Sequence, residues 1–309
     1  MTGPPLEVRG LAKRYGDLVA VAGVDLTVEP GDVFGYLGPN GAGKTTSLRM
    51  MLGLIRPTAG QVRLFGRDPQ LGAAALEGVA GFVEAPRFYP YLSGRTNLEL
   101  LAALDGDGAA SRIDEVLETV ELRDRAGDRV GGYSHGMGQR LGIAAALLRR
   151  PRLLLLDEPA TGLDPAGMRD MRELIRRLAD GGMTVVLSSH LLAEVEEVCN
   201  RVAIIRRGEI VYEGSLAELR RAAGVAYRLR TTDDERAARV CAAQPGIDAV
   251  APGDRSGLTF RASSERAVGE LSLALAEAGA LVLELAPRHA TLEDLFFELT
   301  EERPVAVAA

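Results

Sequence analysis

Cysteine and long apolar runs are scarce in this chain and there is no excess of positive charge, and each of these shortages excludes a class of protein. The 309 residues include two cysteines, Cys199 and Cys241, too few for a disulfide framework or a metal cluster. A reducing cytosol is therefore the expected compartment. No run approaches the ~20 apolar residues that a membrane span needs, and Glu7 and Arg9 interrupt the N-terminus before any apolar core. We expect a chain that is soluble by itself and carries no signal peptide.

The charge balance and the composition narrow the class of protein further. The net charge is −7 and the isoelectric point is about 5.3, whereas nucleic-acid-binding proteins normally carry a strongly basic face. We therefore expect no nucleic-acid partner. Hydrophobic residues make up 47% of the chain and charged residues 26%, which is typical of a globular protein. The length allows one large domain and one small one.

Lysine occurs only at Lys13 and Lys44, and Lys44 lies in the most informative segment of the chain. That segment has the G-x-x-x-x-G-K-T spacing of a phosphate-binding loop and reads Gly38, Pro39, Asn40, Gly41, Ala42, Gly43, Lys44, Thr45 and Thr46. The apolar run Val33 to Leu37 precedes it and predicts a buried strand. The residues that follow have the apolar spacing of a helix. The sequence therefore predicts a nucleoside triphosphate site between a strand and a helix.

The chemistry of such a loop explains its residue types. Glycines let successive backbone N–H groups curl around phosphate oxygens, and the N-terminus of the following helix adds partial positive charge. Lys44 is expected to reach the β- and γ-phosphates, and the hydroxyl of Thr45 is expected to ligate Mg²⁺.

The loop alone leaves kinases, GTPases and motor ATPases open, and two later segments narrow the choice. The apolar strand Leu153 to Leu156 delivers two adjacent carboxylates, Asp157 and Glu158. We expect Asp157 to hold Mg²⁺ directly or through water, and Glu158 to polarise the water that attacks the γ-phosphate. Then come Thr161-Gly162-Leu163-Asp164-Pro165 and, after another apolar strand, Ser188-Ser189-His190.

In their order and separation these motifs closely resemble the ATP-binding cassette (ABC) ATPases, from about residue 6 to 214. The resemblance implies an α/β P-loop fold with a RecA-like core, an antiparallel β subdomain and a helical subdomain, and it implies ATP hydrolysis. It also implies roles for single residues. Tyr15 would stack on adenine, His190 would contact the γ-phosphate, and Asp164 would lie at the interface between two cassettes.

The signature segment of the family is present in an altered form at residues 133–140. Ser134 and Gly136 match the family pattern, whereas Tyr133, His135 and Met137 do not. In the family this segment begins a helix and presents a hydroxyl and backbone N–H groups to the γ-phosphate bound by the other cassette. A dimer with a second copy or a homologous cassette is therefore implied. The bulk of His135 is expected to affect the hydrolysis rate more than binding.

A second departure lies at Glu84, where the family usually carries glutamine. A glutamate still offers an oxygen to Mg²⁺. With the residues that follow, this segment resembles a subgroup of bacterial exporters of drugs and peptide antibiotics, including bacitracin-type and lantibiotic systems. In the family the segment forms the groove that receives a cytoplasmic helix of a separate membrane permease. The resemblance implies an exporter ATPase subunit, cytoplasmic and peripheral on the inner face of the cell membrane.

Two other functions stay open. A soluble ABC ATPase of translation or DNA repair usually carries two cassettes, long coiled-coil insertions or zinc-binding cysteines, and the sequence has none of these. An assembly module that binds ATP without hydrolysis would not need Lys44, Asp157, Glu158 and His190 together.

The pattern changes after the cassette, and we predict domains at 1–220 and 221–303 with a disordered tail at 304–309. The second domain has the order βαββαβ, which fits a small ferredoxin-like α+β fold. Thr291 with Asp294 predicts the start of a final helix. His289 is isolated and has no expected role. Dimer stabilisation or regulation is weighed equally against a passive structural role for this domain.

Overall fold

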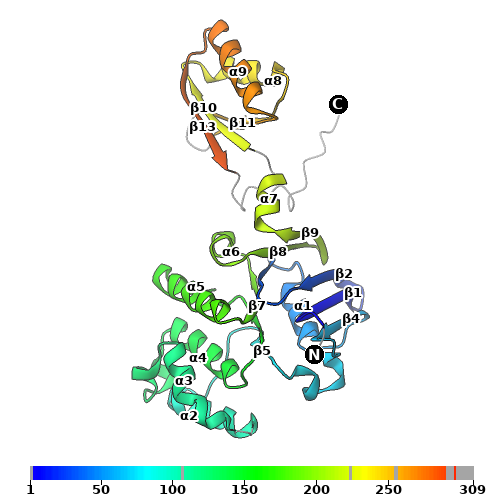
Figure 1. Cartoon of the computed structure of the whole chain (residues 1–309), viewed down its shortest axis with the longest axis vertical. Coiled ribbons are helices and arrows are strands. Elements are labelled where there is room, and N and C mark those ends of the chain that lie inside the picture. Colours follow the sequence, from blue (N-terminus) through cyan, green and yellow to red (C-terminus); the bar gives the residue numbers. More distant parts are fainter. Residues whose placement is uncertain (1–2, 106–107, 223–224, 254–256, 290–295, 297–309) are drawn as a thin grey trace. The chain divides into compact units, whose positions relative to one another are not determined.

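The computed structural model describes residues 3–105, 108–222, 225–253, 257–289 and 296 (Figure 1). The chain divides into two compact units, a first unit that ends at Leu216 and a second unit that spans Ala217–Glu301. The predicted domain boundary at residue 220 stays a prediction. The predicted tail at 304–309 and the helix predicted from Thr291 and Asp294 lie outside the described residues.

The first unit contains a three-stranded antiparallel sheet of strand order β2-β1-β4. Its strands are β1 (Leu6–Tyr15), β2 (Leu18–Val28) and β4 (Ala59–Leu64). Alternation along β2 buries Val24, Leu26 and Val28 and leaves the residues between them more exposed, as expected for a sheet with one face against a core. The antiparallel β subdomain that the family resemblance implies is thereby confirmed.

The second sheet of the first unit has six strands in the order β5-β6-β7-β3-β8-β9. The strands are β5 (Val79–Phe82), β6 (Leu153–Asp157), β7 (Thr184–Ser189), β3 (Val33–Leu37), β8 (Arg201–Arg206) and β9 (Glu209–Ser215). All are parallel except β9, which runs antiparallel to β8. Every residue of β3, β6 and β7 is buried, which explains their continuous apolar sequences.

This strand order determines where the functional side chains meet. Parallel strands bring their carboxyl ends to one edge of the sheet, and β7 lies between β6 and β3. In the register of these strands Asp157 is opposite Ser188, and Leu37 is opposite Ser189. The loops that follow β3, β6 and β7 therefore leave the sheet next to one another.

Helices surround the parallel sheet. They are α1 (Lys44–Met51), α2 (Gly94–Asp105), α3 (Ile113–Thr119), α4 (His135–Leu147), α5 (Pro165–Asp180) and α6 (Leu192–Val198). Figure 1 shows α2, α3 and α4 gathered into a helical part of this unit. Short 3₁₀ turns lie at Pro69–Leu71, Ala73–Leu76, Ala109–Arg112, Arg123–Arg125 and Val130–Gly132.

Strand β5 joins the edge of the parallel sheet, where Val79 and Ala80 pair with β6. Helix α4 ends at Leu147, shortly before Pro151. The predicted α/β architecture, with a parallel P-loop core, an antiparallel sheet and a helical part, is confirmed.

The second unit folds around one four-stranded sheet with the order β11-β12-β10-β13. After α7 (Leu216–Ala222) come β10 (Val225–Thr231), α8 (Asp234–Ala243), β11 (Ile247–Pro252), β12 (Leu258–Ala262), α9 (Glu265–Glu277) and β13 (Val282–His289). All the strand pairs in this sheet are antiparallel. A buried cluster that includes Leu229, Phe260, Leu271 and Leu275 forms its core.

Burial in this core also affects a thiol, because it raises the pKa of Cys241 to about 11.

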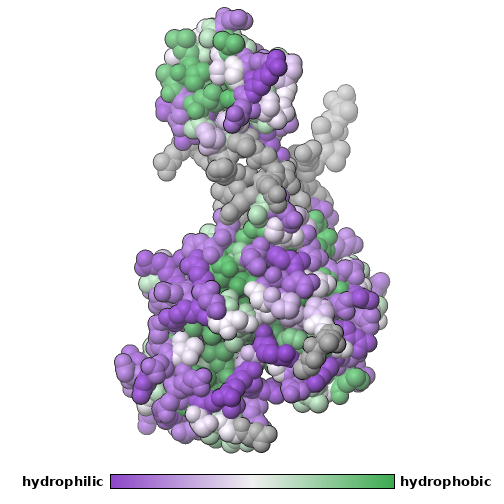
Figure 2. All heavy atoms as spheres, viewed as in Figure 1, coloured by the Kyte–Doolittle hydropathy of each residue, from purple (hydrophilic) through white to green (hydrophobic). Residues whose placement is uncertain are grey.

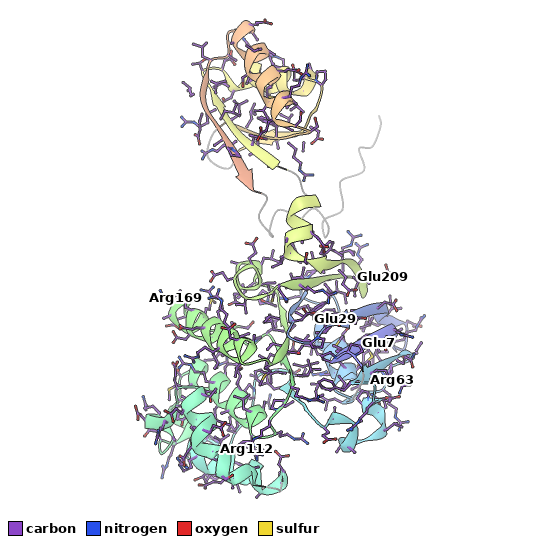
Figure 3. The ribbon with its side chains drawn as sticks, in the orientation of Figure 1. Glu7, Glu29, Arg63, Arg112, Arg169 and Glu209 are labelled. Carbon is purple, nitrogen blue, oxygen red and sulfur yellow. The ribbon has the colours of Figure 1, made fainter. Side chains whose placement is uncertain are left out.

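The surface of the first unit is mostly hydrophilic on the face drawn in Figure 2. Charged side chains such as Glu7, Arg63 and Arg169 lie on its outside (Figure 3). Among the described residues, no helix has the length and apolar character needed to cross a bilayer.

Candidate active site

The phosphate-binding loop connects the buried strand β3 to helix α1, as the sequence predicts. Gly41 and Gly43 adopt positive φ angles of 81° and 105°. A Cβ at Gly43 would lie 2.4 Å from the carbonyl oxygen of Ala20, and one at Gly38 would lie 2.5 Å from that of Ile205. Only glycine fits at these two positions, whereas the α-carbon of Gly41 faces open space.

Lys44 lies at the start of α1 with its side chain buried against the loop. Its Nζ donates to the carbonyl oxygen of Gly38 at 2.8 Å and to that of Pro39 at 3.4 Å. The same Nζ lies 3.4 Å from Oε1 of Glu158. Lys44 therefore joins the phosphate loop to the carboxylate that follows β6.

Asp157 and Glu158 are brought together by one serine hydroxyl. Ser188, at the end of the neighbouring strand β7, donates its hydroxyl to Oδ1 of Asp157 at 2.5 Å and accepts from the backbone N–H of Glu158 at 3.0 Å. Asp157 is 5% exposed. Glu158 has a φ of 47°, a left-handed conformation that is costly for a non-glycine residue and is often found at functional sites.

The carboxylate of Glu158 is surrounded by hydrogen-bond donors. Oε2 accepts from the hydroxyl of Thr161 at 2.8 Å and from Nδ1 of His190 at 3.0 Å. Because an ionised carboxylate only accepts, Nδ1 of His190 must carry the proton. Burial by itself would raise the pKa of Glu158, but Thr161, Lys44 and His190 together outweigh it and hold the pKa below its usual range.

A second carboxyl group lies just beyond His190. Glu194, on α6, is mostly buried, and its Oε2 is 3.4 Å from the hydroxyl of Ser189. Burial raises the pKa of Glu194, although Ser189, Arg172 and His190 oppose this. Glu194 is thus in contact with Ser189, the residue that directly precedes His190.

A cavity of about 330 Å³ opens in front of the phosphate loop. It is lined by Tyr15, Leu18, Val19, Ala20, Asn40, Gly41, Gly43, Lys44, Thr45, Thr46 and Glu158. Tyr15 is 49% exposed, and the Nζ of Lys13 lies 5.0 Å from the centre of its ring. The structure thus brings Tyr15, the phosphate loop and Glu158 around one opening, with Asp157 and His190 held next to it through Ser188 and Glu158.

The signature segment lies outside this cavity. Ser134 is the N-cap of α4, and its hydroxyl accepts from the backbone N–H of Met137 at 3.2 Å. Gly136 lies in the first turn of the same helix. Asp164 is likewise an N-cap, of α5, and accepts from the N–H of Gly167 at 2.8 Å. Within one chain, these three predicted nucleotide-site residues do not meet the phosphate loop.

Glu84 does not line the cavity either. Its carboxylate forms an ion pair with Arg49, on the last turn of α1, and its side chain is 62% exposed. The φ of Glu84 is 66°, so the backbone at this position is left-handed. The magnesium contact expected of Glu84 stays a prediction.

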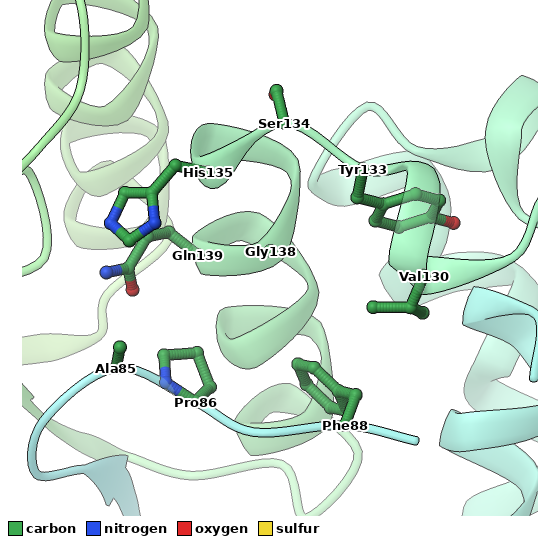
Figure 4. Close-up of a pocket in the computed structure, with 9 residues that line it drawn as sticks. All are labelled: Ala85, Pro86, Phe88, Val130, Tyr133, Ser134, His135, Gly138 and Gln139. Atoms are coloured by element: carbon green, nitrogen blue, oxygen red, sulfur yellow. The ribbon is translucent and has the colours of Figure 1, made fainter. Parts of the chain in front are cut away.

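A smaller cavity of about 210 Å³ lies between the start of α4 and the segment that follows Glu84. Figure 4 shows Pro86 and Phe88 on one side of it and His135 and Gln139 projecting from α4 on another. Gln139 is 4% exposed, and its Oε1 has no hydrogen-bond partner among the described residues.

Two residues of the site, Ser188 and Thr161, have no role predicted from the sequence. The place of Ser188 at the end of a strand beside β6 is the signal that could indicate its contact with Asp157. Thr161 follows Glu158 by three residues, a spacing typical of a turn. Outside the cavity, Arg49 has no sequence signal for its contact with Glu84, because the two residues are distant in sequence.

Comparison with known proteins agrees with this geometry. The family model described as ABC transporter matches residues 21–161. The chain is 47% identical to the uncharacterized ABC transporter ATP-binding protein YdbJ of Bacillus subtilis. The alignment spans 219 residues, which are 70% of this chain and 71% of that protein.

Two relatives match over nearly the whole length. The bacitracin transport ATP-binding protein BcrA of Bacillus licheniformis is 38% identical over 296 residues, 95% of this chain and 96% of that protein. The daunorubicin resistance ATP-binding protein DrrA3 of Streptomyces coeruleorubidus is 37% identical over 318 aligned positions, 100% of both chains.

Solved structures match the first unit. The ATP-binding subunit of an ABC transporter has a TM-score of 0.63 at 30% identity and covers 71% of this chain and 92% of its own. An ATP-binding cassette described as dimeric, in a post-hydrolysis state with ADP and phosphate, has a TM-score of 0.61 at 26% identity, covering 68% of this chain and 98% of that one.

Proposed function

Because the chain belongs to the ABC transporter family of ATP-binding proteins, we propose that it binds and hydrolyses Mg-ATP to drive export of a drug, antibiotic or peptide through a separate membrane permease. The observation that carries the enzymatic part is the convergence of Lys44, Thr161 and His190 on the carboxylate of Glu158 beside the phosphate loop. The names of the two full-length relatives support the exporter part.

The residues around the loop fit a nucleotide and its metal ion. The open side of Gly41 and the N–H groups at the start of α1 suit phosphate oxygens, and Tyr15 offers an exposed aromatic face for a base. Thr45 and Asp157 supply the hydroxyl and carboxylate oxygens that Mg²⁺ prefers, and Glu84 is a further candidate. Bound there, Mg²⁺ would neutralise charge on the phosphates.

Each side chain of the site has a separate role in the proposed hydrolysis. Glu158 is ion-paired with Lys44 and accepts hydrogen bonds from Thr161 and His190. Being ionised, it can orient a water molecule and accept the proton that this water loses. The water oxygen forms a bond to the γ-phosphorus while the bond to the bridging oxygen breaks, and ADP leaves with that electron pair. Lys44 stabilises the phosphate charge, and His190, held through Nδ1 by Glu158, would contact the γ-phosphate through Nε2.

The proposal includes a dimer. Ser134, Gly136 and Asp164 lie away from the phosphate loop of their own chain, at two helix N-termini, where N–H groups favour an anion. A second copy, or a homologous cassette, would bring Ser134 and Gly136 to the γ-phosphate and place Asp164 at the interface between the two cassettes. The dimeric cassette among the similar structures supports this arrangement. The site would then be on the cytoplasmic side of the membrane, beneath the permease.

The experiment compares wild type with Glu158→Gln and Lys44→Ala. We expect wild type to hydrolyse ATP only with Mg²⁺, Lys44→Ala to lose ATP binding, and Glu158→Gln to bind ATP and elute as a dimer only when ATP is present. A dimerisation that is independent of ATP would contradict the proposal. Co-purification of a permease from detergent-solubilised membranes tests the exporter part, and its absence would favour an ABC ATPase not coupled to transport.

A further inference from the structure

His135, which departs from the family pattern, makes a side-chain contact with the segment that follows Glu158. It is the first residue of α4, and its Nε2 lies 3.0 Å from the carbonyl oxygen of Thr161. A carbonyl oxygen can only accept, so Nε2 carries the proton and donates. Figure 4 shows the imidazole ring projecting from the start of α4.

Gly162, directly after Thr161, lets this ring lie close to the backbone. Gly162 has a φ of 79°, and a Cβ at this glycine would lie 3.3 Å from both Cδ2 and Nε2 of His135. That spacing is too tight for most side chains. The ring therefore packs against the backbone of residues 161–162 as well as donating a hydrogen bond to it.

Thr161 also contacts Glu158, through its hydroxyl and through its backbone N–H. The hydroxyl of Thr161 donates to Oε2 of Glu158 at 2.8 Å, and the backbone N–H of Thr161 donates to the carbonyl oxygen of Glu158 at 3.2 Å. These two bonds form a turn whose conformation sets the direction of the Glu158 carboxylate. His135 is bonded to the carbonyl oxygen of the residue whose hydroxyl orients that carboxylate.

We propose that His135 is a positioning residue for ATP hydrolysis, which acts on Glu158 through Thr161. The hydrogen bond to the Thr161 carbonyl holds the turn of residues 158–161 against the N-terminus of α4. The start of the signature helix and the general base are thereby linked within one chain. This inference rests on the proposed function, because it concerns the rate of the same hydrolysis.

The experiment measures kcat and KM for ATP in His135→Ala and His135→Gln. Alanine removes the donor and keeps a strong helix former at the start of α4. Glutamine places an N–H donor three bonds from Cβ, the same number as Nε2 of histidine. We expect His135→Ala to lower kcat about five- to tenfold, the scale of one lost hydrogen bond, with KM unchanged, and His135→Gln to restore most of kcat.

A double-mutant cycle tests whether His135 and Thr161 act on Glu158 together. Thr161→Val removes the hydroxyl and keeps the carbonyl that accepts from His135, whereas Thr161→Ser keeps both groups. If His135 acts through the hydroxyl, His135→Ala should lower kcat little further in the Thr161→Val background. Fully additive losses would overturn the inference, as would a His135→Gln variant as slow as His135→Ala.

The two proposals fail in distinguishable ways. A wild-type chain without Mg-dependent ATPase activity refutes the proposed function, and this inference with it. An active wild type whose His135→Ala variant has the same kcat refutes this inference alone. A His135→Ala variant that raises KM and leaves kcat unchanged also refutes it, because that result would assign His135 to nucleotide binding.

Discussion

The ammonium group of Lys44 lies 3.4 Å from Oε1 of Glu158. One residue comes from the phosphate loop and the other from the end of β6, so the pair links two parallel strands that are separated by β7. The Lys44 side chain is 5% exposed and that of Glu158 is 25% exposed. Water screens this interaction less than it screens a surface ion pair.

The first prediction concerns the pH dependence of ATPase activity. The pKa of Glu158 lies below its usual range, so the carboxylate stays ionised as the pH falls through the ordinary glutamate value of about 4.3. Because Thr161 is the largest of the influences that lower this pKa, Thr161→Val should move the acid limb of the ATPase profile to higher pH.

The corresponding stability effect has a definite sign. Ionised Glu158 stabilises the fold above the pKa of the unfolded chain, and this contribution is lost as the pH falls through the lowered pKa. Urea midpoints of wild type and Glu158→Gln should therefore converge in acid. Identical acid limbs in Thr161→Val and wild type would show that the hydroxyl does not hold the pKa down.

The second prediction concerns Ser188. Replacing Ser188 by alanine leaves the buried carboxylate of Asp157 and the N–H of Glu158 without their shared partner. The cost should be about 1–3 kcal/mol of unfolding free energy, the cost of an unsatisfied buried polar group, together with a loss of kcat. Urea unfolding and ATPase assays measure both. Ser188→Thr, which keeps the hydroxyl, is the matched control, and a fully stable Ser188→Ala would contradict the bridging role.

Much of this site follows from local sequence. The strand, loop and helix around Lys44 each have a local signal, because the apolar run, the glycines and the helical spacing lie within one segment. The parallel core follows from the fully apolar run Leu153 to Leu156.

The contacts between the segments could not be predicted in the same way. Ser188 meets Asp157 only because β6 and β7 pair in one register. The left-handed conformation of Glu158 has no sequence signal, since positive φ is expected at glycine. Glu84 was predicted to face Mg²⁺ by resemblance, whereas its observed partner Arg49 is 35 residues away and is brought near by packing.

The third prediction concerns that Arg49–Glu84 pair. Both side chains are largely exposed, 38% and 62%, so Arg49→Ala and Glu84→Gln should each change the unfolding free energy by less than about 1 kcal/mol. A contact between Glu84 and Mg²⁺ would show in activity and not in stability, because Glu84→Gln would then raise the Mg²⁺ concentration needed for half-maximal ATPase activity.

A more buried pair provides the comparison. Arg201 donates to Asp32, whose side chain is 8% exposed, at 2.9 Å. Arg201→Ala should cost about 1.5–3 kcal/mol, as for a hydrogen bond to a charged group. A stability loss at Arg49 as large as that at Arg201 would show that the exposed pair contributes more than its geometry indicates.

The last prediction concerns the independence of the two units. Phe260 is 1% exposed and stacks on Tyr227 with ring centres 5.4 Å apart, within a core whose described residues all belong to the second unit. Phe260→Ala should cost about 3–5 kcal/mol, the range for emptying a buried aromatic site. Hydrogen exchange should show the loss of protection in residues 225–289.

The first unit should meanwhile keep its nucleotide site, because its core is built from its own strands and α1. Equilibrium binding of a fluorescent ATP analogue to Phe260→Ala should match wild type. Phe34→Ala is the matched control, since Phe34 is fully buried in β3, next to the phosphate loop, and its loss should weaken binding. If Phe260→Ala also abolished nucleotide binding, the second unit would be needed for the first to fold, and division into independent units would be wrong.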